Sequence, residues 1–104
     1  VNIAGHAGDG NFHIIPLMDL KDEMERARLI PVAEAFYKLV AEYRGTTTGE
    51  HNDGIVRTPF LGIMYSPQIL ELFKQVKNIF DPENIFNPGK KVGGTLEDFK
   101  KRLA

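Results

Sequence analysis

This chain of 104 residues has no cysteine, so disulfide bonds are excluded. It has no apolar run near the roughly 18 residues that a membrane-spanning helix requires. It also lacks an excess of charge of either sign, since 13 basic and 14 acidic residues give a formal net charge of -1. A surface that follows nucleic-acid phosphates is basic, so the sequence predicts no nucleic-acid partner.

The composition is that of one soluble globular domain, with 42% hydrophobic and 26% charged residues. A domain of this size is expected to bury somewhat over roughly 60% of its unfolded surface, which is enough for one core. The first residues, VNIA, resemble a strand that runs directly into a glycine-rich loop, and no initiator methionine precedes them. We therefore expect a C-terminal piece of a longer protein.

The first half of the chain is predicted to contain strands around one long helix. Residues 1–5 are expected to form a short buried strand and residues 12–18 a second one, separated by the turn-forming sequence GDGN. The helix either begins near Pro31 or begins earlier and is kinked there, and Gly45 is expected to end it. The β-branched threonines at 46–48 predict a third strand.

The second half is predicted to be helical. Ser66 and Pro67 are typical of an N-cap and a first helical residue, and Asp81 is expected to end that helix. Thr95 predicts the cap of a tail helix over residues 96–103. The first of these helices carries an apolar stripe expected to pack in the core: Ile69, Leu72, Phe73, Val76, Ile79 and Phe80. Together, the strands and helices predicted for the two halves of the chain indicate an α+β fold with helices on one face of a small antiparallel sheet.

All three histidines lie in two short segments, GHAGDGNFH at residues 5–13 and GEH at residues 49–51. This distribution favours one shared site. His6 and His13 can converge across the bend at GDG, and two neutral imidazoles that converge can bind a divalent metal. Glu50 would add a carboxylate, and this set leaves coordination positions open, as in catalytic metal sites. Such a metal could polarise an α-hydroxy acid by binding its hydroxyl and carboxylate oxygens.

His51 is the candidate base of this site. On an extended backbone, His51 and Glu50 point to opposite sides, so they cannot both ligate the metal unless the chain bends. We therefore assign Glu50 to the metal and His51 to the substrate, because an imidazole titrates near neutral pH and suits proton abstraction.

Simpler interpretations of these segments stay open. Histidines near a glycine turn are commonly surface residues that form hydrogen bonds, and Asp9 and Asn11 can be plain turn formers. The glycines suggest a phosphate-binding loop only weakly, because no Gly-Lys-Ser/Thr ending and no helix follow them. Lys90 and Lys91 are expected to be solvated unless the sequence NPGK lies against a ligand.

Three motifs together resemble a known family. Residues 5–13 resemble the GHxGDGNxH signature of FAD-linked oxidases of the vanillyl-alcohol-oxidase type, and residues 49–51 resemble their GEHG motif. Residues 81–90, DPENIFNPGK, resemble their closing DPxxIxNPGK segment. The resemblance is closer to the C-terminal domain of the D-lactate dehydrogenase, glycolate oxidase and D-2-hydroxyglutarate dehydrogenase group. Residues 53–61 are similar to members that are fused to an iron–sulfur region.

The resemblance implies a role for each site residue. It implies that His6, His13 and Glu50 ligate an active-site divalent metal, often zinc. His51 would take the proton of the substrate hydroxyl while a hydride passes to the flavin of FAD.

The resemblance also implies a fold and a partner domain. The implied fold is a ferredoxin-like α+β cap on the substrate side of a separate FAD-binding domain. Residues 1–104 would then be the C-terminal part of this cap (substrate) domain, and the FAD-binding domain would be absent from this chain. Asn87 and Lys90 would lie near the flavin ring.

Two positions depart from the family pattern. Asn52 stands where the second glycine of GEHG is usual, and asparagine is the non-glycine residue that best tolerates a positive φ. The turn is therefore expected to survive. Ile15 stands where some 2-hydroxy acid members carry a polar residue, which leaves the substrate open.

The leading hypothesis is a segment of an FAD-dependent oxidoreductase that oxidises a small D-2-hydroxy acid to the 2-oxo acid, with the segment inactive by itself. The alternative is a free-standing or degenerate metal-binding or association domain without redox activity. The expected partners are the 2-hydroxy acid, the FAD-binding domain of the same protein and, as an electron acceptor, an iron–sulfur centre. Surface left by the missing half of the cap predicts a homo-oligomer. The expected location is the cytoplasm or the inner face of a membrane.

Overall fold

The computed structural model describes residues 1–103. Two short strands, β1 (Asn2–Ala4) and β2 (His13–Ile15), pair as an antiparallel hairpin. A 3-10 turn, η1 (Ala7–Asp9), lies between them, and Gly10 closes it in the left-handed conformation. The two predicted strands are thus confirmed, although both are shorter than expected. β1 is exposed rather than buried, because within the described residues this sheet consists of the hairpin alone.

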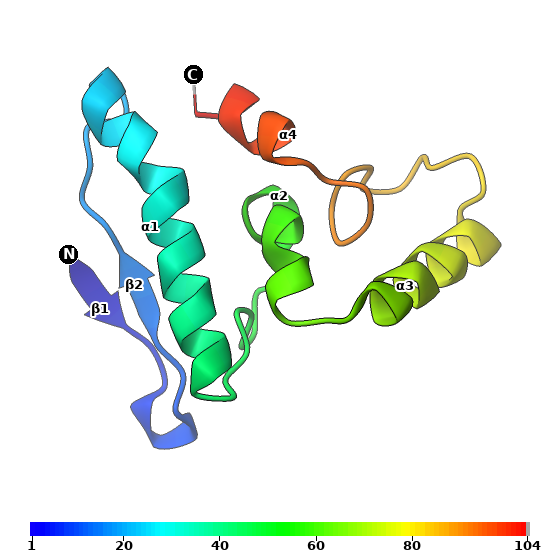
Figure 1. Cartoon of the computed structure of the whole chain (residues 1–104), viewed down its shortest axis with the longest axis horizontal. Helices are drawn as coiled ribbons and strands as arrows, with labels where there is room; N and C mark the ends of the chain where they lie inside the picture. Colours follow the sequence, from blue (N-terminus) through cyan, green and yellow to red (C-terminus); the bar gives the residue numbers. More distant parts are fainter. Residues whose placement is uncertain (104) are drawn as a thin grey trace.

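The long helix α1 (Glu23–Glu42) begins well before Pro31 and runs through it. The side chain of Asp22 caps its first turn by accepting hydrogen bonds from the backbone N–H groups of Met24 and Glu25. Of the two starting points that the sequence left open, the earlier one is therefore correct. The hairpin runs beside this helix (Figure 1).

A small aromatic core joins three elements. Tyr37 of α1, Phe60 of η2 (Thr58–Ile63) and Phe99 of α4 (Leu96–Lys101) are all buried. The ring centroids of Tyr37 and Phe60 are 5.1 Å apart, and those of Phe60 and Phe99 are 6.4 Å apart in an edge-to-face arrangement. Thr95 forms a capping box with Asp98, so the predicted tail helix is confirmed. The core fixes α4 against α1.

The helix α3 (Pro67–Phe80) has the predicted cap, with the Ser66 hydroxyl accepting from the backbone N–H of Ile69, and it ends at Asp81. The prediction that its apolar stripe packs in the core is wrong. Only Phe73 of the stripe is half-buried, with its ring edge-to-face against Tyr65 at 5.2 Å. The rest of the stripe is exposed, because α3 projects away from α1 and the hairpin (Figure 1).

Residues 46–48 do not form the predicted third strand. Instead, the Thr46 hydroxyl donates to the carbonyl of Thr48, and the N–H of Thr48 donates to that hydroxyl, which closes a local turn. A short helix, α2 (Gly54–Arg57), follows this segment. Local hydrogen bonds of this kind replace those that a neighbouring strand would supply.

The α+β class is confirmed by the small antiparallel sheet and the helices that accompany it. The order β1, β2, α1 matches the ββα portion of the ferredoxin-like βαββαβ pattern. Among the described residues, no helix combines the length and the hydropathy needed to cross a membrane.

Candidate metal centre

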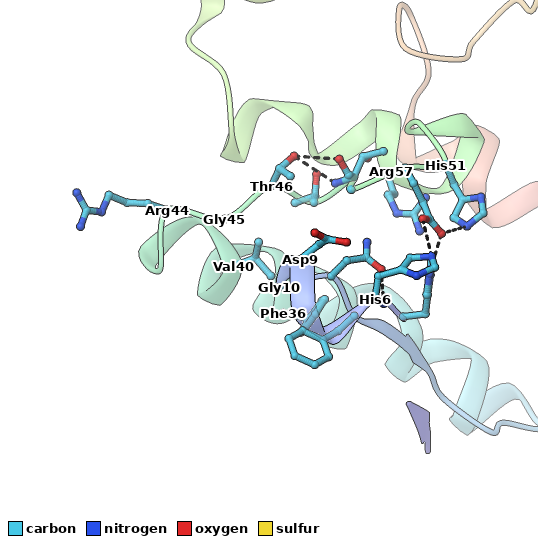
Figure 2. Close-up of a pocket in the computed structure, with 17 residues that line it drawn as sticks. His6, Asp9, Gly10, Phe36, Val40, Arg44, Gly45, Thr46, His51 and Arg57 are labelled. Atoms are coloured by element: carbon cyan, nitrogen blue, oxygen red, sulfur yellow. Dashed lines mark hydrogen bonds and ion pairs between the residues drawn. The ribbon is translucent and has the colours of Figure 1, made fainter. Parts of the chain in front are cut away.

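Three imidazoles converge on one carboxylate, that of Glu50. The Nε2 atoms of His13 and His51 lie 2.9 Å and 2.7 Å from its Oε1 atom. The Nε2 atom of His6 lies 3.3 Å from its Oε2 atom. Figure 2 shows His6 and His51 directed toward this carboxylate from opposite loops. The shared site that the sequence predicts from its three histidines is therefore present in the structure.

The loop after β1 is closed by local hydrogen bonds that fix the backbone of His6. The carbonyl of His6 accepts from the N–H groups of Asp9, at 2.8 Å, and Asn11, at 3.2 Å. The N–H of His6 donates to the side-chain oxygen of Asn11 at 3.3 Å. Gly5 has a φ of 135°, and a Cβ atom there would collide with the carbonyl oxygen of Asn11. Asn11 is therefore a turn former that also fixes a candidate ligand.

The second loop bends where the sequence predicts a bend. Asn52 has a φ of 58°, which confirms that asparagine keeps the left-handed conformation here. Its side-chain oxygen accepts the N–H of Asp53 at 2.9 Å. Because the chain bends, Glu50 and His51 meet instead of pointing apart as they would on a straight strand. A Cβ atom on Gly49 would collide with the side-chain amide of Asn11, so the two loops are in close contact.

The donor set suits a divalent metal. Donor atoms of His13, Glu50 and His51 all lie within 4.8 Å of one another. A tetrahedral ion with bonds of about 2.0–2.1 Å separates its ligand atoms by about 3.3 Å. Only the contact of His6, at 3.3 Å, equals this value, whereas His13 and His51 lie 2.9 Å and 2.7 Å from Glu50, at ion-pair distance, and would move slightly apart around an ion. Imidazole nitrogen with one carboxylate oxygen is a set that zinc commonly accepts. His6 lies outside the closest group, against the other oxygen of the carboxylate.

The site opens into a cavity of about 710 Å³. Its walls combine the histidine loops with Phe36 and Val40 of α1, the threonines of residues 46–48, Arg44 and Arg57. The side chain of Arg44 extends away from the histidine cluster (Figure 2). The side chains of His6 and His51 are 64% and 65% exposed, so the ring of donors is accessible from solution. A cavity of this size can admit a small ligand to the cluster.

Arg57 is the cationic residue that the sequence interpretation missed. Its guanidinium donates to the carbonyl of Asn52 at 2.9 Å, which keeps it beside the bend of the second loop. It also faces Tyr37, where burial raises the pKa of the phenol and the nearby positive charge of Arg57 opposes that rise. Its place in the cavity depends on its contact with Tyr37 of α1, which is distant in the sequence and which no local sequence signal reveals.

The two residues predicted to lie near a flavin, Asn87 and Lys90, are not among the residues that line the cavity of the histidine cluster. Asn87 and Lys90 line a separate cavity against α3, and the Lys90 ammonium donates to the Asn87 side-chain oxygen at 3.2 Å. Their predicted contact with a flavin stays a prediction. The Lys91 side chain, which the sequence predicts to be solvated, is 37% exposed, and its ammonium pairs with buried Asp53 at 2.6 Å.

Comparison with known proteins identifies the family. Residues 1–91 match the model of the family described as FAD linked oxidases, C-terminal domain. The chain is 43% identical over 101 residues to the glycolate oxidase subunit GlcD of Bacillus subtilis, a match that covers 95% of this chain and 20% of that protein. No solved structure matches the chain significantly.

Two further relatives carry other hydroxy acids in their names. The chain is 39% identical over 90 residues to a D-2-hydroxyglutarate dehydrogenase of Stutzerimonas stutzeri, with 83% of this chain and 19% of the relative covered. It is 39% identical over 88 residues to a D-lactate dehydrogenase of Archaeoglobus fulgidus, a match that covers 85% of this chain and 19% of that relative. The chain thus spans about a fifth of the length of the curated relatives it matches.

The family match contains every motif discussed above. Both histidine segments and the NPGK sequence fall inside residues 1–91, and the match covers most of the chain. The chain therefore belongs to the family of FAD-linked oxidase C-terminal domains.

Proposed function

We propose that this chain forms the metal- and substrate-binding side of an FAD-dependent oxidoreductase. Its substrate would be a small D-2-hydroxy acid of the lactate, glycolate or 2-hydroxyglutarate type, and its product the 2-oxo acid. The convergence of three imidazoles on the Glu50 carboxylate, at the wall of an open cavity, is the observation that carries this proposal. Relatives named for oxidation of these three acids support the substrate class.

His6, His13 and Glu50 are the proposed ligands of a divalent metal, with zinc as the candidate. When bound, the ion supplies positive charge beside the substrate oxygens, and the flavin supplies an acceptor for two electrons. Two contacts support this role, because the Nε2 atoms of His6 and His13 lie 3.3 Å and 2.9 Å from the two oxygens of the Glu50 carboxylate, beside an open cavity.

His51 is the proposed base that takes the substrate hydroxyl proton. Its Nε2 atom lies 2.7 Å from the Glu50 carboxylate. A carboxylate at that distance orients the imidazole and stabilises the imidazolium that forms when the proton arrives. With 65% of its side chain exposed, His51 is also reachable from the cavity.

Arg57 favours an anionic substrate. It is the cation that lines the cavity beside the bend at Asn52, and its guanidinium is held there by the carbonyl of that residue. A fixed positive charge in a cavity raises the local concentration of carboxylates. This agrees with a hydroxy acid, whose carboxylate is ionised at neutral pH.

The remaining partner is the FAD-binding domain of the same protein. The exposed apolar face of α3 adjoins the cavity that contains Asn87 and Lys90. A contiguous exposed apolar face commonly marks an interaction surface. Contact between this region and the FAD-binding domain would bring Asn87 and Lys90 to the flavin. An iron–sulfur centre as electron acceptor is proposed only from the resemblance of residues 53–61.

The flavin-loaded enzyme that contains this chain provides the test. His51→Gln is expected to lower kcat by about 10²–10⁴-fold with D-lactate, glycolate or D-2-hydroxyglutarate, because it removes the base. Lys38→Gln is the control, since Lys38 lies on α1 in an exposed pair with Glu34 at 2.7 Å. Unchanged turnover in His51→Gln, or turnover of none of these acids by the wild type, would refute the proposal.

A further inference from the structure

Asp53 is an almost completely buried carboxylate, only 2% exposed, close to the loop that carries Glu50 and His51. Its two oxygens have different partners. The Lys91 ammonium lies 2.6 Å from Oδ2, and the Thr48 hydroxyl donates to Oδ1 at 2.6 Å. A buried charge requires such partners, because its removal from water is otherwise costly.

The contact with Thr48 closes the metal loop on itself. Thr48 precedes Glu50, and Asp53 follows His51, so this one hydrogen bond joins the two ends of the segment that holds both side chains. The segment cannot straighten while the bond is intact. The backbone N–H of Asp53 also donates to the side-chain oxygen of Asn52, which fixes the bend between them.

The contact with Lys91 ties the closed loop to the rest of the fold. The N–H of Lys91 donates to the Thr58 hydroxyl at 2.7 Å, which fixes its backbone. Its ammonium lies over the aromatic rings of Tyr65 and Phe73, 5.8 Å and 5.2 Å from their centroids. Lys91 is thereby held between α3 and η2, and it directly follows Lys90 in the chain.

We propose that Asp53 and Lys91 are positioning residues for the metal centre. Their ion pair holds the segment 48–53 in the bent form that brings Glu50 and His51 together. It also links this segment to the one that contains Asn87 and Lys90. Removal of Lys91 leaves Asp53 as an uncompensated buried charge, so we expect the loop to open toward water and the carboxylate of Glu50 to move with it. Where metal binding is concerned, this inference rests on the proposed function.

Zinc affinity is the first test, measured by competition with a chromogenic chelator. Lys91→Met keeps the aliphatic stem but removes the charge, and we expect its zinc affinity to be roughly 10–100-fold weaker than that of the wild type. Lys91→Arg is expected to restore most of the affinity, because it restores the charge. Thr48→Val removes the other hydrogen bond of Asp53 without burying a new charge, and we expect a smaller loss in the same direction.

The chain offers a matched control in a second lysine–aspartate pair. Lys77 pairs with Asp81, which is 6% exposed, at the end of α3 and away from the histidine loops. Lys77→Met removes a comparable pair, so it reports what the loss of such a pair does to the fold in general. We expect its zinc affinity to equal that of the wild type, with folding of every variant checked by circular dichroism.

A second readout does not depend on metal. The three histidines are all in the site, so their imidazole Cε1–H resonances report its geometry in the metal-free chain. Lys91→Met is expected to shift the His51 resonance, whereas Lys77→Met is not. If the wild type binds zinc while Lys91→Met binds it within twofold and the resonances stay in place, the positioning inference is wrong. If the wild type binds no zinc but the resonances move, the inference stands and the metal assignment fails.

Discussion

The imidazole rings of His13 and His51 have centroids 5.2 Å apart and planes tilted by 59°. His13 begins β2 and is fixed by the hairpin, whereas His51 lies in the loop that precedes α2. Their Nε2 atoms approach the same oxygen of Glu50, at 2.9 Å and 2.7 Å. The centre is therefore formed by contact between two loops, and its geometry depends on how closely they approach.

Loop contact makes one glycine essential to the centre. Gly5→Ala would place a Cβ atom against the carbonyl oxygen of Asn11, at a φ of 135° that L-residues rarely adopt. We expect zinc affinity at least about tenfold weaker, because His6 is the next residue and would move with the backbone. Gly8→Ala is the matched control in the same loop, since a Cβ atom there meets nothing within 4 Å. Equal losses in both variants would contradict this explanation.

Asn52 is expected to contribute conformational stability through its backbone. Asn52→Ala should lower the free energy of unfolding by about 1 kcal/mol, because alanine tolerates a φ of 58° less well than asparagine. Asn52→Gly should come closer to the wild type, since glycine adopts this φ readily. Urea denaturation of the three proteins measures both differences. A loss in the glycine variant as large as that in the alanine variant would assign the effect to the lost hydrogen bond with Asp53 instead.

Asp81 is expected to make stability depend on acid pH. The Lys77 ammonium, followed by the N–H groups of Ile85 and Phe86, lowers the pKa of Asp81 below its ordinary value. The stability from this group is therefore present above its unfolded pKa of about 3.9 and is lost as pH falls through the lower pKa of the folded state. Asp81→Asn should destabilise the chain at pH 7 and flatten its acid denaturation profile. Glu83→Gln, at an exposed position in the turn that follows buried Asp81, should change neither.

The donor set predicts the order of metal preference. The proposed ligands, the two imidazoles of His6 and His13 and the carboxylate of Glu50, favour zinc and cobalt over magnesium and calcium, which prefer sites made only of oxygen. Millimolar magnesium is therefore expected to leave bound zinc in place, whereas cobalt should compete for the site. Elemental analysis of the dialysed protein measures this competition. Displacement of zinc by magnesium would show that the imidazoles do not ligate the ion.

The sequence predicts those features that local chemistry decides. The cap at Ser66, the end of α3 at Asp81 and the positive φ of Asn52 follow from single residues and their neighbours. The histidine cluster is also predicted, because all three histidines fall in two glycine-containing segments.

Features that depend on distant packing are not predicted. The threonines of residues 46–48 have the β-branched composition of a strand, but a strand needs a partner, and they form a local turn instead. The stripe on α3 has helical periodicity, but periodicity does not say whether a face is covered. The pairing of Asp53 with Lys91 joins residues far apart in the sequence, so a single sequence gives no signal for it.

The most direct test of this account compares the zinc affinities of the wild type, His13→Ala and His51→Ala. The account predicts a tightly bound ion in the wild type. It predicts that zinc affinity falls at least about 100-fold in His13→Ala, because this variant loses a metal ligand. In His51→Ala the affinity should change only a few-fold, because this variant loses the base and no ligand. The double variant His6→Ala/His13→Ala should retain no zinc. An equal loss in His51→Ala would make His51 a ligand rather than the base, and a wild type without affinity for zinc would contradict the metal centre itself.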